Sequence, residues 1–416
     1  MNGPEFDADV LILGAGPAGS TVAHLLAKHG HSVRVLEKET FPRFHVGESL
    51  LPIDEAIFAR LGFVADRDRY LYKAGAEFLD ERTGEFAEYP FSDALPGTPD
   101  HAWQVDRARF DEELADLAEA AGVEIRYGVK VTAVDIDDDA GHGGVTVTAA
   151  DGEHRGRYVI DATGQDAFIA RRRKLIHPVK GFGVIAAFSH FTNLSDEVAE
   201  ELAKKGNVKI LIHDDGWAWL IPLAGKRLGF GVVSRRGGVG AQIVDEVAAK
   251  SELIQRLSRG ADRTEPTLIR HFAYLNTKPY GSRYACVGDS AAFLDPVFSS
   301  GISLAMQAAE HVADTLAPAL TDGSEGRDDL MDPVQARLRD AYIIFGSLIK
   351  SFYSTNLVNH FFFHPDPEPE LRAGLTSILA GDVFRDDNRF QDLVVNSRRR
   401  WTPESQFESA SAPVDA

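Results

Sequence analysis

Three glycines near the N-terminus have the spacing that a phosphate-binding turn requires. Gly14, Gly16 and Gly19 lie in the stretch GAGPAG, between an apolar run at 9–13 and a pattern of helical period that ends at Gly30. In such a strand, turn and helix the first glycine permits the tight turn, and the second lets the backbone approach a diphosphate at the helix N-terminus. The third lets helix and strand pack closely. The alternative is a glycine turn with a purely structural role.

An acidic residue follows at the distance that a dinucleotide site needs. The next strand, HSVRVLEKE, contains Glu37, eighteen residues after Gly19. A carboxylate at the end of this strand binds the ribose hydroxyls of an adenosine. The combination predicts dinucleotide binding.

Two of the four tryptophans stand one residue apart in DDGWAWLIP (214–222). In an extended strand Trp217 and Trp219 point to one face, while Ala218 and Leu220 point to the other. The pair is therefore either ordinary packing within a sheet or a wall that faces a ligand.

Composition restricts the partners of the chain. Its 416 residues include 44 basic and 63 acidic ones, a formal charge of -19, which disfavours nucleic acid as a partner. The basic exceptions are RRRK at 171–174 and RRR at 398–400, and such runs are commonly solvated surface.

Cysteine content and hydropathy indicate the compartment. The single cysteine, Cys286, excludes an intrachain disulfide and a cysteine-based metal site, and its strand-like surroundings predict burial. No apolar run of about 18 residues is present for a membrane span, and the acidic N-terminus does not resemble a signal peptide. We expect a cytoplasmic protein without a membrane partner. The polar segment after Trp401 is predicted to be a disordered tail.

Three further stretches resemble landmarks of flavoprotein hydroxylases and their relatives. They are QVDRARFD (104–111), YVIDATG (158–164) and YACVGDSAAFLDP (284–296). The resemblance implies FAD rather than NAD, with Arg107 contacting the flavin and Asp289 binding its ribityl or ribose part. A helix is expected to begin near Gly301.

Two patterns resemble one branch of this superfamily, the flavin-dependent halogenases. WAWLIP (217–222) matches the fingerprint W-x-W-x-I-P, and FLDPVFSSG (293–301) matches a second pattern. FPRFHVGESLLP (41–52) is similar to the stretch that covers the flavin in halogenases and geranylgeranyl reductases. The resemblance implies an FADH2- and O2-dependent enzyme of secondary metabolism that converts chloride or bromide to hypohalous acid and halogenates an electron-rich aromatic ring.

The same resemblance implies roles for individual residues. Lys73, in YLYKAGAEF, matches a lysine that either hydrogen-bonds the hypohalous acid as an ammonium or is chlorinated as a neutral amine. Trp217 and Trp219 would wall the route between flavin and substrate, and the backbone N–H groups of Ser300 and Gly301 would bind halide. The expected cofactor-binding residues are Gly14, Gly16, Pro17, Ala18, Gly19, Glu37, Lys38, Arg43, Gly47, Glu48, Ser49, Arg107, Val131, Asp289, Gly301 and Ile302.

One departure concerns the substrate. The branch that halogenates free tryptophan has a glutamate at the position of Phe298, where it assists proton loss from the ring. Phe298 therefore indicates the phenol and pyrrole branch, with phenols preferred, and is assigned to the substrate pocket. The substrate is expected either free or on an acyl or peptidyl carrier protein, for which the basic run at 171–174 could be a dock. Because no second nucleotide fingerprint is present, a separate flavin reductase is expected to supply FADH2.

Two histidines, His360 and His364, are four apart, as metal ligands on a helix can be, but no third ligand accompanies them. We interpret this aromatic segment as part of a lid and expect no metal.

The predicted fold is α/β, with a Rossmann-like FAD-binding domain, a sheet-based substrate domain and a helical C-terminal region. The expected ranges are 1–72, 102–165 and 282–340 for the first, 73–101 and 166–281 for the second, and 341–416 for the third. The competing functions are a flavin-dependent monooxygenase or geranylgeranyl-reductase-like enzyme, and a non-catalytic flavin-binding scaffold. The presence of Lys73 and of both halogenase patterns favours the halogenase.

Overall fold

The apolar run near the N-terminus forms the centre of a parallel sheet. The computed structural model describes residues 6–136, 143–354, 362–364, 368–398 and 400–408. Strand β1 (Ala8–Leu13) pairs in parallel with β2 (Val33–Leu36) on one side and with β10 (Gly152–Asp161) on the other. Both faces of β1 are buried, which explains why its sequence is almost continuously apolar.

The first sheet continues in both directions from these three strands. Its order is β19-β20-β10-β1-β2-β7, and the hairpin β8–β9 joins it through β10. The further strands are β7 (Glu124–Arg126), β8 (Val131–Asp135), β9 (Val145–Ala149), β19 (Tyr280–Gly281) and β20 (Tyr284–Cys286). The helices that pack beside it include α1 (Pro17–Lys28), α2 (Asp54–Leu61) and α3 (Arg107–Ala120). This is the expected Rossmann-like arrangement.

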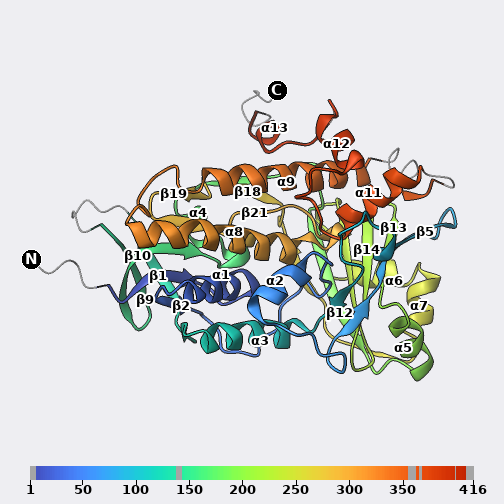
Figure 1. The fold of residues 1–416 in the computed structure, drawn as a ribbon. Coiled ribbons are helices and arrows are strands. Elements are labelled where there is room, and N and C mark those ends of the chain that lie inside the picture. The colour runs from blue at the N-terminus through green and yellow to red at the C-terminus, as the bar shows by residue number, and fades with distance from the viewer. Residues whose placement is uncertain (1–5, 137–142, 355–361, 365–367, 399, 409–416) are drawn as a thin grey trace, which may run out of the picture.

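The second large sheet is mainly antiparallel, with the order β16-β12-β15-β14-β13-β4-β5 and β17 beside β12. Its strands are β4 (Gly75–Asp80), β5 (Glu85–Pro90), β12 (Ile185–Thr192), β13 (Val208–His213), β14 (Gly216–Leu223), β15 (Arg227–Ser234), β16 (Asp262–Arg263) and β17 (Thr267–Arg270). One face packs against α5 (Asp196–Ala203), α6 (Ile243–Ala248) and α7 (Glu252–Leu257), near the lower right of Figure 1.

Two long helices connect the cores of the two sheets. Helices α8 (Ser300–Asp322) and α9 (Asp332–Phe352) lie side by side along the molecule (Figure 1). The buried side chains of α9 belong to the first core up to Leu338 and to the second core from Ala341 onward. The expected boundary after residue 340 therefore falls at this change of core, but inside a continuous helix. The division of the chain into domains stays a prediction.

The segment after Trp401 differs from the expected disordered tail. Helices α11 (Pro369–Leu379) and α12 (Arg389–Asn396) are followed by α13 (Pro403–Glu408), so the prediction is wrong for residues 403–408. Trp401 is buried against Gly346, and Glu404 makes a two-point ion pair with Arg339. These tertiary contacts stabilise a polar segment whose composition alone predicts disorder. Residues 409–416 lie outside the described residues.

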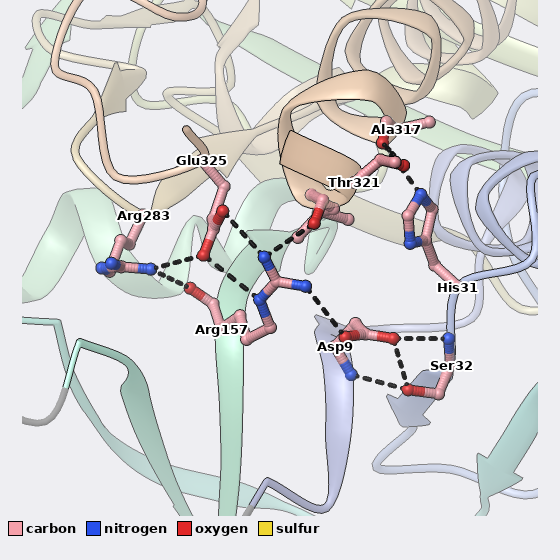
Figure 2. A network of polar contacts seen from close by, with 9 residues as sticks. Asp9, His31, Ser32, Arg157, Arg283, Ala317, Thr321 and Glu325 are labelled. Atoms are coloured by element: carbon pink, nitrogen blue, oxygen red, sulfur yellow. Dashed lines mark hydrogen bonds and ion pairs between the residues drawn. The ribbon is translucent and has the colours of Figure 1, made fainter. Parts of the chain in front are cut away.

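A polar network ties the first sheet to the end of α8. Figure 2 shows Arg157 of β10 reaching Glu325 and Asp9, while Glu325 also pairs with Arg283. Arg157 donates to the carbonyl oxygen of Leu320 as well, across 2.7 Å. The network joins the central strands β1 and β10 to the C-terminal end of α8 and holds the helix against the sheet.

The remaining elements are short. They are β3 (Leu71–Lys73), β6 (Ala102–Gln104), β11 (Ile176–Pro178), β18 (Tyr274–Asn276), β21 (Ala292–Phe293), α4 (Phe168–Arg172) and the 3-10 turns η1 (Phe91–Asp93), η2 (Gly164–Asp166), η3 (Gly288–Ser290) and η4 (Pro296–Phe298). Among the described residues, no helix is long and apolar enough to cross a membrane.

Candidate active site

A cavity of about 600 Å³ is lined by residues of both large sheets. Most of the predicted site residues lie on its wall. They are Gly14, Gly16, Pro17, Ala18, Glu37, Lys38, Arg43, Gly47, Glu48, Ser49, Arg107, Val131, Trp217, Trp219, Asp289, Gly301 and Ile302. Four predicted residues do not line it: Gly19, Lys73, Phe298 and Ser300.

The glycine turn fits a dinucleotide diphosphate. Gly14 has a φ of +96°, and a Cβ there would lie 2.6 Å from the carbonyl oxygen of Ala162. A Cβ on Gly19 would lie 2.0 Å from the carbonyl oxygen of Gly14, so Gly19 serves helix packing rather than the wall. Helix α1 has no acidic residue in its first turn and no side-chain cap at Gly16. Its N-terminal N–H groups and positive dipole end can therefore bind a diphosphate.

Glu37 is fixed at the end of β2. Its side chain is buried, with Oε2 accepting from the N–H of Ala15 across 2.8 Å and Oε1 accepting from the N–H of Glu39 across 2.9 Å. A carboxylate held beside the glycine turn fits the ribose hydroxyls of FAD.

Residues 43–49, which we call the cover segment, are anchored by Arg107. Its Nη1 donates to the carbonyl oxygens of Val46 (2.6 Å) and Gly47 (3.2 Å), and its Nε donates to Asp111 (2.7 Å). Arg43 also donates to Asp111, across 2.9 Å. Burial acts to raise the pKa of Asp111, but the two arginines hold it below its usual value.

Glu48 ties the cover segment to the second sheet. Its Oε1 lies 2.7 Å from Nε2 of His190 on β12. A Cβ on Gly229 would lie 2.6 Å from the other carboxylate oxygen, so glycine leaves room for this side chain. The cover segment therefore contacts both α3 and the second sheet.

Burial shifts the pKa values of His45 and Asp289 on the cavity wall. Burial, aided by the charge of Arg107, lowers the pKa of His45 to about 4, so this imidazole is neutral near pH 7. Burial raises the pKa of Asp289 to about 7, although Arg107 opposes the shift. Asp289 follows β20 and lines the cavity.

The tryptophan pair forms part of the wall, as one of the two sequence interpretations predicted. Trp217 and Trp219 lie on the same face of β14, with ring centroids 5.7 Å apart, and both line the cavity. Trp219 lies opposite Gly231 of β15, where a Cβ would be 2.0 Å from the indole ring. A glycine is therefore required for the indole to lie flat across the neighbouring strand.

Trp217 is held by a chain of hydrogen bonds. Its Nε1 donates to the hydroxyl of Tyr353 across 3.0 Å, and that hydroxyl donates to Asp295 across 2.8 Å. Asp295 also accepts from the N–H groups of Gly183 and Val297. Burial raises the pKa of Asp295 to about 6, against the opposing effect of these donors.

Lys73 lies behind the cavity wall. Its side chain is 1% exposed, and Nζ donates to the carbonyl oxygen of Leu50 across 2.7 Å. Burial lowers the pKa of Lys73 to about 7, and the charge of Asp54 opposes this shift. Burial likewise raises the pKa of Asp54 to about 6, although this carboxylate accepts from Ser303 of α8 across 2.5 Å. The two buried groups therefore titrate close to neutral pH.

The start of α8 lies at the cavity, but Phe298 does not. Helix α8 begins at Ser300 with no acidic residue in its first turn, and Ser299 and Gly301 line the cavity. Phe298 is buried, stacked on Phe362 and edge-on to Phe352, with centroid distances of 6.1 Å and 6.0 Å. The structure thus places Phe298 in an aromatic cluster beside the site.

Several wall residues were not predicted. Phe44 and His45 belong to the cover segment and could have been named from that stretch. Phe188 comes from β12 and Phe272 from the loop between β17 and β18, and no local motif marks them. Arg172 also lines the cavity. It belongs to the basic run at 171–174, whose sequence predicts either solvated surface or a docking site for a carrier protein.

The predicted histidine pair falls partly outside the residues that the structure describes. His360 lies outside the described residues, and no group of three His, Cys, Asp or Glu side chains there could hold a metal ion.

Comparisons with known proteins agree with the site. A family model described as tryptophan halogenase matches residues 9–97 and 93–363. The chain is 30% identical to a 1H-pyrrole-2-carbonyl-[peptidyl-carrier protein] brominase of Pseudoalteromonas luteoviolacea, over 90% of this chain and 92% of that one. It is 26% identical to the corresponding chlorinase of Pseudomonas fluorescens, over 91% and 90%.

A solved structure supports the same assignment. The flavin-dependent brominase Bmp2 superposes with a TM-score of 0.82 at 26% identity, covering 97% of this chain and 99% of that one. These matches favour the halogenase over the monooxygenase, the reductase and the scaffold. The chain belongs to the tryptophan halogenase family and is an FAD-dependent enzyme that uses FADH2 with chloride or bromide to halogenate an aromatic substrate.

Proposed function

We propose that the substrate is a pyrrole or phenol ring and that a carrier protein presents it. The observation that carries the proposal concerns position 298, where a phenylalanine replaces a carboxylate and packs in an apolar cluster that includes the rings of Phe352 and Phe362. Electrophilic halogenation forms a cationic ring that must lose a proton. A phenol oxygen or pyrrole nitrogen delocalises this charge, so these rings need no carboxylate beside them.

The relatives support the pyrrole and the carrier. The names of both compared enzymes specify a pyrrole-2-carbonyl group on a peptidyl carrier protein. The sequence alone favoured phenols over pyrroles as substrates. Because both relatives are named for a carrier-bound pyrrole, we place the pyrrole first and the phenols second.

We propose that Lys73 is the lysine that reacts with or hydrogen-bonds the hypohalous acid. Bound FADH2 supplies, with O2 and halide, the hypohalous acid that halogenates the ring. Nζ of Lys73 can donate to the oxygen of this acid after leaving the carbonyl oxygen of Leu50. With a pKa of about 7, the same group can also be a neutral amine that is itself chlorinated.

Two further roles are assigned: binding of the halide to backbone N–H groups, and separation of the substrate from the flavin to aromatic side chains. The N–H groups of Ser300 and Gly301, at the positive end of α8, are proposed to hold the halide. Trp217 and Trp219 are proposed to keep the aromatic substrate away from the flavin, which prevents direct hydroxylation of the ring.

We further propose that a separate reductase supplies FADH2, because the chain has one nucleotide fingerprint. Anaerobic mixing of the FAD-loaded protein with NADPH tests this supply. The flavin absorbance is expected to persist until a flavin reductase is added, and rapid bleaching by the protein alone would contradict it.

The single, buried Cys286 supports a reducing compartment, the cytoplasm.

A substrate panel tests the main proposal. Pyrrole-2-carbonyl on a peptidyl carrier, a set of free phenols and free tryptophan are each incubated with identical FADH2 supply, and the halide-dependent product mass is measured. The carrier-bound pyrrole is expected to be halogenated fastest and the phenols next. Efficient chlorination of free tryptophan, with pyrrole and phenols unchanged, would overturn the assignment.

A further inference from the structure

The basic run Arg171–Lys174 is exceptional in this acidic chain. All four residues are exposed, and none has a carboxylate within ion-pair distance in the part of the chain that the structure describes. Many other surface arginines are paired, such as Arg256 with Glu201 and Arg339 with Glu404. The run therefore presents uncompensated positive charge.

Aromatic rings hold the three guanidinium groups in place. Arg171 lies over Tyr274 at 5.6 Å, Arg172 over Phe168 at 4.2 Å, and Arg173 over Tyr284 at 5.0 Å from the ring centroids. A guanidinium that stacks on a ring keeps its N–H groups available at the edge of its plane. Arg171 uses two of its nitrogens to donate to the carbonyl oxygen of Gln165, whereas the side chains of Arg172 and Arg173 have no hydrogen bond in the described contacts. The positive charge is thus fixed at one place on the surface.

That place is the adenosine end of the FAD cavity. Arg172 lines the cavity, together with Gln165, Asp166 and Phe168 that precede it. Asp166 accepts from Lys38 across 2.6 Å, and Lys38 directly follows Glu37, the predicted ribose ligand. Arg172 therefore connects the basic run to the end of the cavity that receives the adenosine part of the cofactor.

The cofactor is an anion that approaches a protein of the same sign. FAD carries a diphosphate, the chain has a formal charge of -19, and Glu37 and Glu39 line the same end of the cavity. Repulsion of this kind lowers association rates, and a local patch of opposite charge raises them.

We propose that Arg171–Lys174 is an electrostatic entry site that steers the diphosphate of the flavin dinucleotide into the adenosine end of the cavity. The proposal rests on the proposed function in one respect: with a separate reductase, FADH2 enters anew during turnover, so its association rate matters.

The alternative occupant, an acidic carrier protein, fits this place less well. A carrier must deliver its ring to the side of the cavity walled by Trp217 and Trp219, which belong to the second sheet. Arg172 lines the cavity beside Asp166 and Phe168, and Arg173 stacks on Tyr284 of β20, which belongs to the first sheet. A carrier docked there would deliver its substrate at the adenosine end.

The test compares two pairs of substitutions that change the net charge equally. Arg172→Gln with Arg173→Gln removes two charges from the entry site, and neither side chain has a hydrogen bond in the described contacts. Arg398→Gln with Arg400→Gln removes two charges from the other basic run, which does not line the cavity. Thermal melting first verifies that both variants are folded.

Association of oxidised FAD is followed by stopped-flow flavin fluorescence, from about 0.02 M to about 0.5 M potassium acetate, which avoids halide. At low salt the double substitution of Arg172 and Arg173 is expected to lower the association rate constant by about tenfold. The double substitution of Arg398 and Arg400 is expected to lower it by less than about twofold. The difference should disappear at high salt, and the dissociation rate should change little.

Three results would overturn the proposal. Equal effects of the two pairs would assign the rate to net charge, and a difference that persists at high salt would assign it to direct contact. An unchanged flavin association rate together with a raised KM for a carrier-bound substrate would assign the run to the carrier. Because FAD association is measured without substrate, a failed substrate panel leaves this test unaffected.

Discussion

The indole N–H of Trp217 donates to the hydroxyl of Tyr353 across 3.0 Å, and through this hydroxyl reaches Asp295. Trp217 belongs to W-x-W-x-I-P, and Asp295 belongs to the FLDPVFSSG stretch. Tyr353 lies just after α9 and outside both patterns. The C-terminal region therefore joins the two fingerprints of the family at the cavity wall.

The hydrogen-bond chain predicts a stability loss for Tyr353→Phe. Removal of the hydroxyl leaves a buried indole N–H and the buried Asp295 without their shared partner, which costs about 1–3 kcal/mol. Urea unfolding measures the loss. The control is Tyr158→Phe, because the hydroxyl of Tyr158 is buried without a hydrogen-bond partner among the described residues. Equal stabilities of the two variants would contradict a role for the chain.

The contact between Trp219 and Gly231 predicts that Gly231→Ala displaces the indole. The added Cβ would lie 2.0 Å from the ring, so the tryptophan must move or the sheet must distort. Overpacking of this kind costs about 1–3 kcal/mol, and we expect FAD binding to weaken because Trp219 lines the cavity. Thermal melting and FAD titration measure the two effects. Gly237→Ala, where a Cβ meets nothing within 4 Å, should change neither.

Lys73→Ala is predicted to abolish halogenation while FAD still binds, because Lys73 does not line the flavin cavity. Loss of one donor from a preorganised site lowers the rate by about a hundredfold or more. Lys73→Met keeps most of the buried volume and separates the loss of the amine from the loss of packing. If Lys73→Met retained most of the halogenating activity, the assigned role would be wrong.

Asp54→Asn is predicted to move the pH dependence of halogenation. The pKa of Lys73 is about 7, so the ammonium form is present below this value and is lost as the pH rises through it. If the ammonium is the reactive donor, the single-turnover rate falls above about pH 7. The carboxylate of Asp54 raises the pKa of Lys73, so its removal should shift this fall to lower pH.

The control for this shift is Glu55→Gln, since Glu55 lies in the same turn of α2 and its charge raises the pKa of Asp54, whereas the charge that raises the pKa of Lys73 is that of Asp54. Product mass after one turnover, with FADH2 supplied in advance, gives the rate at each pH. A rate that instead rises through pH 7 would indicate the neutral amine and the chloramine route.

Local pattern was enough to determine the parts of the site that depend on neighbours in the chain. The glycine turn at Gly14–Gly19, the carboxylate Glu37 at the end of the next strand and the shared face of Trp217 and Trp219 all follow from turn geometry and strand periodicity. These features hold whatever the order of strands in the sheets.

Contacts between distant segments were decided only by the tertiary structure. The burial of Lys73 behind Leu50, the hydrogen bond from Trp217 to Tyr353 and the position of Arg172 on the cavity wall depend on how the sheets and α9 pack. Residues 403–408 are a further example. Their polar composition predicts disorder, yet they form α13 next to Trp401, which is buried against Gly346. Residue types and spacing therefore determined the chemistry available to this chain. Packing between segments far apart in sequence decided which side chains face the cavity and with which charge, since burial and neighbouring charges set each pKa.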